Sequence, residues 1–169
     1  MDDVELRLQL ERVHAECFGW AMACCKRDRD DAEEVLQTVY LKVLDGRARY
    51  DGRSAFRTWI FGVIRRTAAA ERRKAWLRRL LLNREVGSLL PAAPASPDAE
   101  VERDSRSNGL RHSLARLAAR QREVLQLVFY HDLTVEEAAA VMGVSVGSAR
   151  THYARGKAHL AVLLGDGKL

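Results

Sequence analysis

The chain has 169 residues, of which 47% are hydrophobic and 30% are charged, and it contains only three prolines. This composition is that of a folded, helix-rich protein and excludes a disordered chain. The formal net charge of +5 favours a polyanionic partner. Residues 1–5 are mostly acidic, and no apolar run long enough for a signal peptide or a membrane span follows them. We therefore expect a cytoplasmic protein that does not insert into membranes.

The first predicted helix covers residues 4–27 and includes all three cysteines. Its apolar stripe comprises Leu6, Leu10, Val13, Cys17, Ala21 and Cys24. The spacing of three and four residues is that of one helix face, and free cysteine is usually buried, so we interpret Cys17 and Cys24 as core residues. With Cys25 in the same segment, a disulfide framework is not expected. A metal or redox site of His14, Cys17 and Cys24 is the alternative, although no second ligand pair occurs at structural-zinc spacing.

A second helix is predicted over residues 32–44, after a polar turn at 28–31. Asp31 and Glu34 supply its start signal. Its apolar face comprises Val35, Leu36, Val39, Tyr40, Val43 and Leu44, and its outer face comprises Glu33, Glu34, Gln37, Thr38, Leu41 and Lys42. A leucine among outward polar residues indicates a partner surface at Leu41.

A third helix follows the loop at residues 46–52, with Ser54 as its predicted cap. Its inward residues are Phe56, Trp59, Ile60, Val63, Ile64 and Thr67. Eight cations follow, with Glu71 as the one acid among them: Arg65, Arg66, Arg72, Arg73, Lys74, Arg78, Arg79 and Arg84. Solvated helices usually mix both signs of charge, so this stretch favours a phosphate backbone as partner over solubility alone.

Residues 83–108 contain all three prolines (Pro91, Pro94 and Pro97) and no helical stripe, which predicts a linker. Helical patterning resumes at Leu110. A hydrophobic platform for the helix-turn-helix is expected from Leu114, Leu117, Val124, Leu125, Leu127, Val128 and Phe129. The sequence thus predicts two small domains on either side of the linker.

Residues 133–157 have the pattern of a DNA-binding helix-turn-helix. Thr134 and Glu137 form a capping box, Gly143 ends the first helix and Ser145 can cap the second. The second helix has an inner stripe of Ala149, Tyr153, Gly156 and Leu160, and an outer side of Ser148, Arg150, Thr151, His152 and Arg155. Hydroxyls and arginines bind base edges and phosphates, which predicts DNA binding. An ordinary helical hairpin with a solvated basic face is the alternative.

Separate stretches resemble one family, the sigma-70 initiation factors. Residues 31–43, DAEEVLQTVYLKV, are similar to the D-A-E-D-(apolar)₂-Q-E-x-F-(apolar)-R signature of region two. The FRTWI stretch at 56–60 with Arg65 and Arg66 resembles the F-R-T-W-L…R-N motif that follows it, and YDGRSAF at 50–56 resembles the loop before it. Residues 114–160 resemble region four. Because regions one and three are not recognised, the chain is identified as a member of the small extracytoplasmic-function group.

The resemblance implies an all-α fold of two small helical domains joined by a flexible linker: a region-two helical bundle over 1–82, the linker over 83–108 and a region-four helix-turn-helix over 109–169. It implies a promoter-specificity subunit of RNA polymerase, without catalytic residues, metal or cofactor, and monomeric when free. The implied partners are core RNA polymerase (the β′ clamp helices and the β flap), promoter DNA and an anti-sigma factor.

The resemblance also implies three groups of site residues. The polymerase-binding residues would be Asp31, Glu34, Gln37, Leu41 and Lys42. The −10 element would be bound and melted by Tyr50, Asp51, Arg53, Ser54, Arg65, Arg66, Arg72 and Arg73. The −35 element would be bound by Ser148, Arg150, Thr151, His152, Arg155 and Lys157.

The chain departs from the family pattern at three positions. Thr38 stands where glutamate is usual, which leaves the strength of polymerase docking open. Arg66 stands where asparagine is common, and His152 where arginine is frequent, which leaves the promoter preference open at these two positions. A stand-alone helix-turn-helix regulator that binds duplex DNA without polymerase is the competing hypothesis. An enzyme is not expected, because the sequence shows no catalytic spacing and no phosphate-binding glycine loop.

Overall fold

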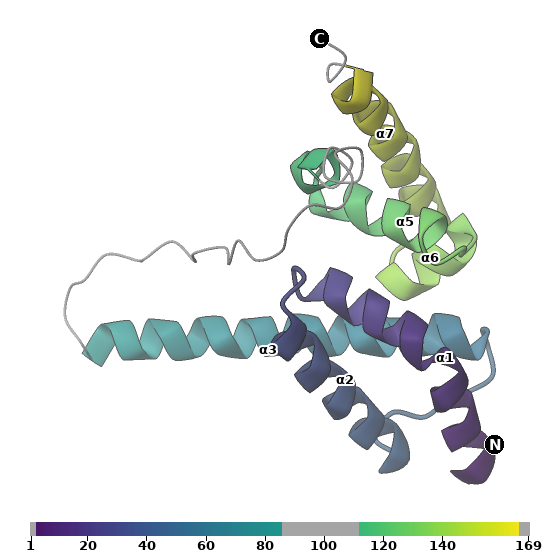
Figure 1. The fold of residues 1–169 in the computed structure, drawn as a ribbon, viewed down its shortest axis with the longest axis vertical. Helices are drawn as coiled ribbons and strands as arrows, with labels where there is room; N and C mark the ends of the chain where they lie inside the picture. The colour runs from purple at the N-terminus through teal and green to yellow at the C-terminus, as the bar shows by residue number, and fades with distance from the viewer. Residues whose placement is uncertain (1–2, 86–111, 166–169) are drawn as a thin grey trace, which may run out of the picture.

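The computed structural model describes residues 3–85 and 112–165, and within these residues the regular structure is helical. Figure 1 shows one group of helices from the N-terminal half of the chain and a second group from the C-terminal half. The helices are α1 (Asp3–Cys24), α2 (Arg29–Leu44), α3 (Phe56–Glu85), α5 (Ala119–Phe129), α6 (Val135–Met142) and α7 (Val146–Gly165). None of the helices in the described ranges is both long and apolar enough to cross a membrane. The expected all-α fold is confirmed.

The N-terminal bundle is built from α1, α2 and α3, each of which packs against the other two. The predicted inward faces are confirmed at most positions, with Cys17, Val39 and Ile60 fully buried. The indole Nε1 of Trp20 donates a hydrogen bond of 3.1 Å to the carbonyl of Phe61. This bond satisfies the polar atom of the largest buried side chain and joins α1 to α3.

Two predicted helix starts are wrong. Helix α2 begins at Arg29, three residues before the predicted start, because the Asp28 carboxylate caps it by accepting a 3.0 Å bond from the backbone N–H of Asp31. The Ser54 hydroxyl donates to the carbonyl of Ala55 and does not cap α3. Helix α3 also runs on to Glu85, so it includes the first three residues assigned to the linker. The rest of the predicted linker, with its prolines, and Leu110 lie outside the described residues.

The three cysteines are free thiols, as predicted, and Cys17 and Cys25 are buried. Burial raises the pKa of the Cys17 thiol to about 12 and that of Cys25 to about 11, and it also raises the pKa of Cys24. The alternative metal site receives no support, since His14 Nδ1 lies 3.0 Å from the Tyr40 hydroxyl. The described residues also contain no metal-binding group of three or more His, Cys, Asp or Glu side chains. Thiols with raised pKa values are unreactive, which favours the core interpretation.

The helix-turn-helix forms as the local signals predict. Thr134 and Glu137 make a capping box at the start of α6. Gly143 ends α6 with φ 65°, and the Ser145 hydroxyl accepts a 3.1 Å bond from the N–H of Ser148 at the start of α7. The predicted platform is confirmed at Leu117, Val124, Leu125 and Leu127. It is wrong for Phe129, which is 60% exposed and stacks on Tyr153.

Helices α5 and α7 pack closely together at Gly156. A Cβ atom at this position would lie 3.1 Å from Leu125 Cδ1 and 3.3 Å from the backbone carbonyl oxygen of Gln121. A Cβ atom here would be tighter than ordinary van der Waals contact, and the backbone oxygen cannot move aside as easily as a side chain, so the packing of the two helices favours glycine at this position.

Replacing Gly156 with valine is expected to lower the free energy of unfolding by about 1–3 kcal/mol through overpacking. Gly147, where a Cβ atom would have only Ser145 Oγ within 4 Å, at 4.0 Å, provides the matched control, and Gly147→Ala is expected to be neutral or stabilising. Urea unfolding followed by circular dichroism measures both. Equal stability of Gly156→Val and the unchanged protein would show that the two helices are less tightly constrained than the distances indicate.

The two groups of helices pack against each other, chiefly through α3 and α6. One hydrophobic cluster includes Ile64 of α3 together with Val124, Leu133 and Met142 of the C-terminal group. The sequence predicts two independent domains and does not predict this contact.

Candidate nucleic-acid interface

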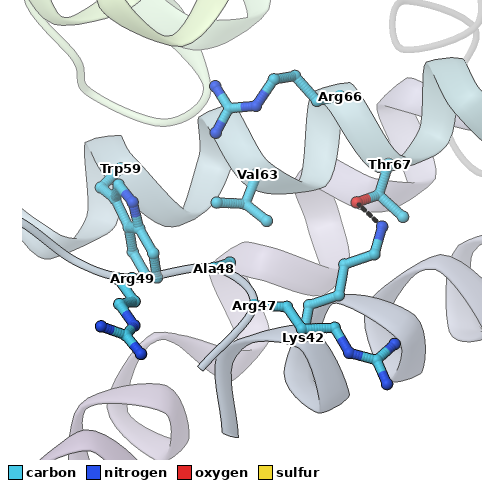
Figure 2. Close-up of a pocket in the computed structure, with 8 residues that line it drawn as sticks. All are labelled: Lys42, Arg47, Ala48, Arg49, Trp59, Val63, Arg66 and Thr67. Atoms are coloured by element: carbon cyan, nitrogen blue, oxygen red, sulfur yellow. Dashed lines mark hydrogen bonds between the residues drawn. The ribbon is translucent and has the colours of Figure 1, made fainter. Parts of the chain in front are cut away.

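A cationic pocket lies between the end of α2, the following loop and α3 (Figure 2). Its volume is about 410 Å³, and it is lined by Lys42, Arg47, Ala48, Arg49, Trp59, Val63, Arg66 and Thr67. Lys42 Nζ donates a 3.2 Å bond to Thr67 Oγ1 across the pocket, a bond drawn in Figure 2. A pocket lined by four cations and one indole ring is suited to an unstacked base and its phosphates, because the ring offers a stacking surface and the cations offer charge.

The loop before α3 is held by Tyr50. Its hydroxyl donates to the carbonyl of Ser54, and its ring lies 5.4 Å from the rings of both Phe56 and Trp59. Asp51 accepts from the N–H of Arg53 at 3.1 Å. Tyr50 thus orders the loop beside the pocket, while Asp51 and Arg53 remain exposed.

The four arginines of α3 that are predicted to bind the −10 element have different environments. Arg65 is paired with Glu123 of α5, and Arg72 donates to the carbonyl of Cys24 at the end of α1. Arg66 and Arg73 are exposed and form no ion pair with the other described residues. Only Arg66 of the four lines the pocket. Arg49, which begins the loop that the family resemblance implies for the flipped −10 base, also lines this pocket. Lys42, Arg47 and Trp59 belong to the pocket and were not predicted as DNA contacts; the basic residues of the loop were the signal available in the sequence.

The five residues predicted to bind polymerase all lie on α2. Asp31, Glu34, Gln37 and Leu41 are exposed on one side of the helix, and Leu41 is 56% exposed. Lys42 differs, because it is half-buried and its side chain is directed to Thr67 of α3. The outward surface is therefore acidic and polar around Leu41, and Leu44, which was predicted on the inner face, is exposed one turn further along α2.

The six residues predicted to bind the −35 element lie on α7, and all but the half-buried His152 are exposed. Arg150 forms a 2.7 Å ion pair with Glu136 of α6, and this bond lowers the pKa of the Glu136 carboxyl. Thr151 Oγ1 donates to the carbonyl of Gly147 at 3.0 Å. Lys157 Nζ lies 5.3 Å from the centre of the Tyr153 ring. The most N-terminal turns of α7 thus present hydroxyl and guanidinium groups to the surface.

Comparisons with known protein families agree with this arrangement. Residues 10–78 match the family model described as sigma-70 region 2, and residues 107–160 match the model described as sigma-70, region 4. The two models together cover well over half of the chain. The three N-terminal helices and the cationic pocket fall within the first match, and the helix-turn-helix falls within the second.

Individual relatives are distant in sequence. The chain is 26% identical to the RNA polymerase sigma factor YlaC of Bacillus subtilis, over 78% of this chain and 76% of the relative. It is 29% identical to the RNA polymerase sigma factor CarQ of Myxococcus xanthus, over 90% and 86%. It is 26% identical to the ECF RNA polymerase sigma factor SigC of Mycobacterium tuberculosis, over 82% and 72%.

Two solved structures share the fold. The sigma factor RpoE of Bartonella quintana, in complex with the anti-sigma factor NepR, matches with a TM-score of 0.70 at 22% identity, over 95% of this chain and 97% of that chain. CnrH in complex with the cytosolic domain of CnrY matches with a TM-score of 0.65 at 21% identity, over 99% and 92%.

With both conserved regions matched in order, the chain belongs to the sigma-70 family. Within that family its relatives place it in the extracytoplasmic-function group, and its function is that of an RNA polymerase sigma factor.

Proposed function

We propose that residues 1–82 (region two) attach this sigma factor to core polymerase and open the −10 element, while residues 109–169 (region four) bind the −35 element, with residues 83–108 as the linker. The protein supplies no catalytic group of its own. The observation that carries the proposal is the cationic pocket beside Trp59, which has the chemistry needed to hold a base taken out of the duplex.

In the first step, the outward face of α2 docks on the β′ clamp helices, with region four on the β flap. In the second step, the pocket captures an unstacked base of the −10 element, and Arg66 and Arg73 hold the adjacent phosphates. Base flipping costs a few kcal/mol, and stacking on an aromatic ring recovers about 1–3 kcal/mol per base. Phosphate contacts supply the rest of the free energy needed for base flipping, so no nucleotide hydrolysis is required.

Run-off transcription with purified core polymerase and a pool of genomic templates tests the function as a whole. We expect transcripts that start at defined positions only when this protein is added. A stand-alone regulator would instead bind duplex DNA tightly without polymerase, so a gel shift with the protein alone distinguishes the two. Tight duplex binding together with no promoter-dependent transcript would contradict the proposal.

The pocket is tested by the double variant Arg49→Ala/Arg66→Ala. Each phosphate contact to a single strand contributes roughly 0.7 to the slope of log K against log salt concentration. The variant holoenzyme is therefore expected to bind a single-stranded −10 oligonucleotide with a slope reduced by roughly 1.4. Arg12→Ala, at an exposed position on α1, is the control. An equal slope for the double variant, the control and the unchanged protein would show that the pocket does not contact DNA.

Docking is tested at Leu41, the exposed apolar side chain in the acidic face of α2. Leu41→Glu is expected to weaken binding of core polymerase about tenfold or more, because a buried interface residue would become a charge without a partner. Leu8→Glu, on α1 at 49% exposure, is the matched control and should leave binding unchanged. Fluorescence anisotropy of labelled protein titrated with core polymerase measures both.

The two solved structures contain anti-sigma factors, and an anti-sigma factor is accordingly part of the proposal for this chain. A pull-down from the source cells identifies it.

A further inference from the structure

The C-terminal part of α3 extends past the bundle to which its first half belongs. The last α3 residue in the hydrophobic core is Ala68, and the helix continues to Glu85. Figure 1 shows this end of α3, in teal, projecting beyond α1 and α2. Every side chain from residue 76 to residue 82 is exposed. A helix segment that contacts only water is expected to be polar on all sides, and this segment is not.

One face of the projecting segment is apolar. Trp76 is followed four positions later by Leu80. Leu77 is followed in the same way by Leu81, so the four side chains share one face of the helix. Their exposed fractions lie between 46% and 62%. Single exposed apolar side chains are common, but a contiguous group of large ones indicates an interaction surface.

Cations border this apolar face on both sides. Lys74 and Arg78 lie one turn apart along one border, and Arg79 lies along the other. Lys74 Nζ pairs with Glu71 at 2.8 Å. Arg78 and Arg79 form no ion pair with any other residue that the structure describes. Leu82 is next to these two arginines, away from the apolar face. The sequence contains no acidic residue from 74 to 82, so the segment is both cationic and apolar.

These two properties together select the partner. A DNA backbone would attract the cations but leave the apolar face in water. A second copy of the chain could cover the apolar face, but it would bring two sets of cations together. A membrane surface with anionic lipids satisfies both properties, because the headgroups attract the cations and the boundary with the acyl chains accepts leucine and tryptophan. Tryptophan prefers this boundary, since its ring is apolar and its N–H group is polar.

We propose that residues 74–82 of α3 bind the surface of membranes that contain anionic lipids, with the apolar face among the headgroups and with Arg78 and Arg79 on the lipid phosphates. The segment lies in the plane of the surface and does not cross the bilayer, because its length of about 14 Å is half that of the hydrocarbon core, about 30 Å. It begins after Arg72 and Arg73, which are the last residues of α3 that we expect at the −10 element.

Flotation of the full chain with lipid vesicles tests this proposal. We expect binding to vesicles of phosphatidylglycerol and phosphatidylcholine, and much weaker binding to vesicles of phosphatidylcholine alone. The variant Trp76→Ala/Leu80→Ala should bind the mixed vesicles at least about tenfold more weakly, because half of the apolar face is removed.

The matched control is Val4→Ala/Leu8→Ala, which removes two exposed apolar side chains from α1 and should leave vesicle binding unchanged. All four substituted positions are exposed, and alanine favours helix. Circular dichroism should therefore show the same helix content in both double variants and in the unchanged protein.

The fluorescence of Trp76 gives a second measurement. The other two tryptophans of the chain, Trp20 and Trp59, belong to the N-terminal bundle. Vesicles should therefore shift the emission to shorter wavelength mainly through Trp76, as water leaves its ring. The variant Trp76→Phe keeps an aromatic side chain on the apolar face, so it should still float with the vesicles but lose this shift.

Equal vesicle binding by Trp76→Ala/Leu80→Ala and the unchanged protein, or no binding to either type of vesicle, would overturn the proposal. Equal affinity for neutral and anionic vesicles would overturn the role of the cations. An emission shift caused by duplex DNA and not by vesicles would assign the surface to nucleic acid. A dimer that is lost in Trp76→Ala/Leu80→Ala, without vesicle binding, would assign it to a second copy. The assay contains neither polymerase nor promoter, so its outcome is independent of the run-off test of the proposed function.

Discussion

Replacing Arg150 with alanine is expected to reduce promoter-dependent transcription about tenfold. A guanidinium group at the start of a helix in the major groove can bond a guanine bidentately or hold a phosphate, and one such contact changes binding by roughly five- to 150-fold. Run-off transcription from a promoter with an intact −35 element measures the loss. A template whose −35 element is scrambled provides the control, because the variant and the unchanged protein should be equal on it.

The ion pair of Arg150 with Glu136 makes this prediction more specific. Both side chains are largely exposed, at 68% and 53%, and exposed pairs contribute little to stability. Breaking this ion pair costs little free energy, so Arg150 can exchange Glu136 for a DNA contact. Glu136→Gln is therefore expected to change transcription by less than about threefold. If Glu136→Gln were as defective as Arg150→Ala, Glu136 would be required to orient the arginine.

Acid is expected to destabilise the protein through His131. Its pKa is lowered from 6.5 to about 4, mainly by burial among the aromatic rings, with Arg57 lowering the pKa and Glu16 and Asp132 raising it. The unfolded chain binds a proton at His131 below about pH 6.5, whereas the folded chain binds it only below about pH 4. Between these pH values, unfolding therefore takes up one proton. The stabilising contribution is complete above about pH 6.5 and is lost as the pH falls toward 4, by about 3 kcal/mol in total.

Urea unfolding at pH 7, 6, 5 and 4.5 measures this loss. Carboxylates also titrate in the lower part of the range, so the comparison is with His131→Phe. This variant keeps an aromatic ring against Trp20 and Phe61 and removes the titrating group. The unchanged protein should lose more stability on acidification than the variant. Equal losses would mean that the His131 proton has the same affinity in the folded and unfolded chains.

Local signals in the sequence predicted the helix-turn-helix well. The capping box of Thr134 and the glycine stop at Gly143 depend on residues three or four positions apart, and the structure confirms both. The burial of Cys17 followed in the same way from helical spacing. The start of α2 was missed because Asp28 and Asp31, three positions apart, could each serve as cap, and the geometry selects Asp28.

The contact between the two regions could not be predicted from spacing. Arg65 and Glu123 are 58 positions apart, and each is an ordinary surface residue by its local pattern. His131 follows a helix end and is followed by a polar residue, which indicates a loop and gives no sign of burial. Only the packing of α6 on α3 brings these side chains into the N-terminal bundle. The pocket was partly missed for the same reason, because Lys42 and Trp59, which both line it, come from different helices.

The buried thiols of Cys17, on α1, and Cys25, directly after α1, can report how often the N-terminal bundle opens. A thiol-specific reagent reacts with the thiolate, and the raised pKa values and burial of Cys17 and Cys25 suppress that form in the folded bundle. Modification must then await transient opening of α1, so its rate under native conditions measures how often the bundle opens. No label has to be introduced, and the same native side chains can compare the free protein with its complex with polymerase.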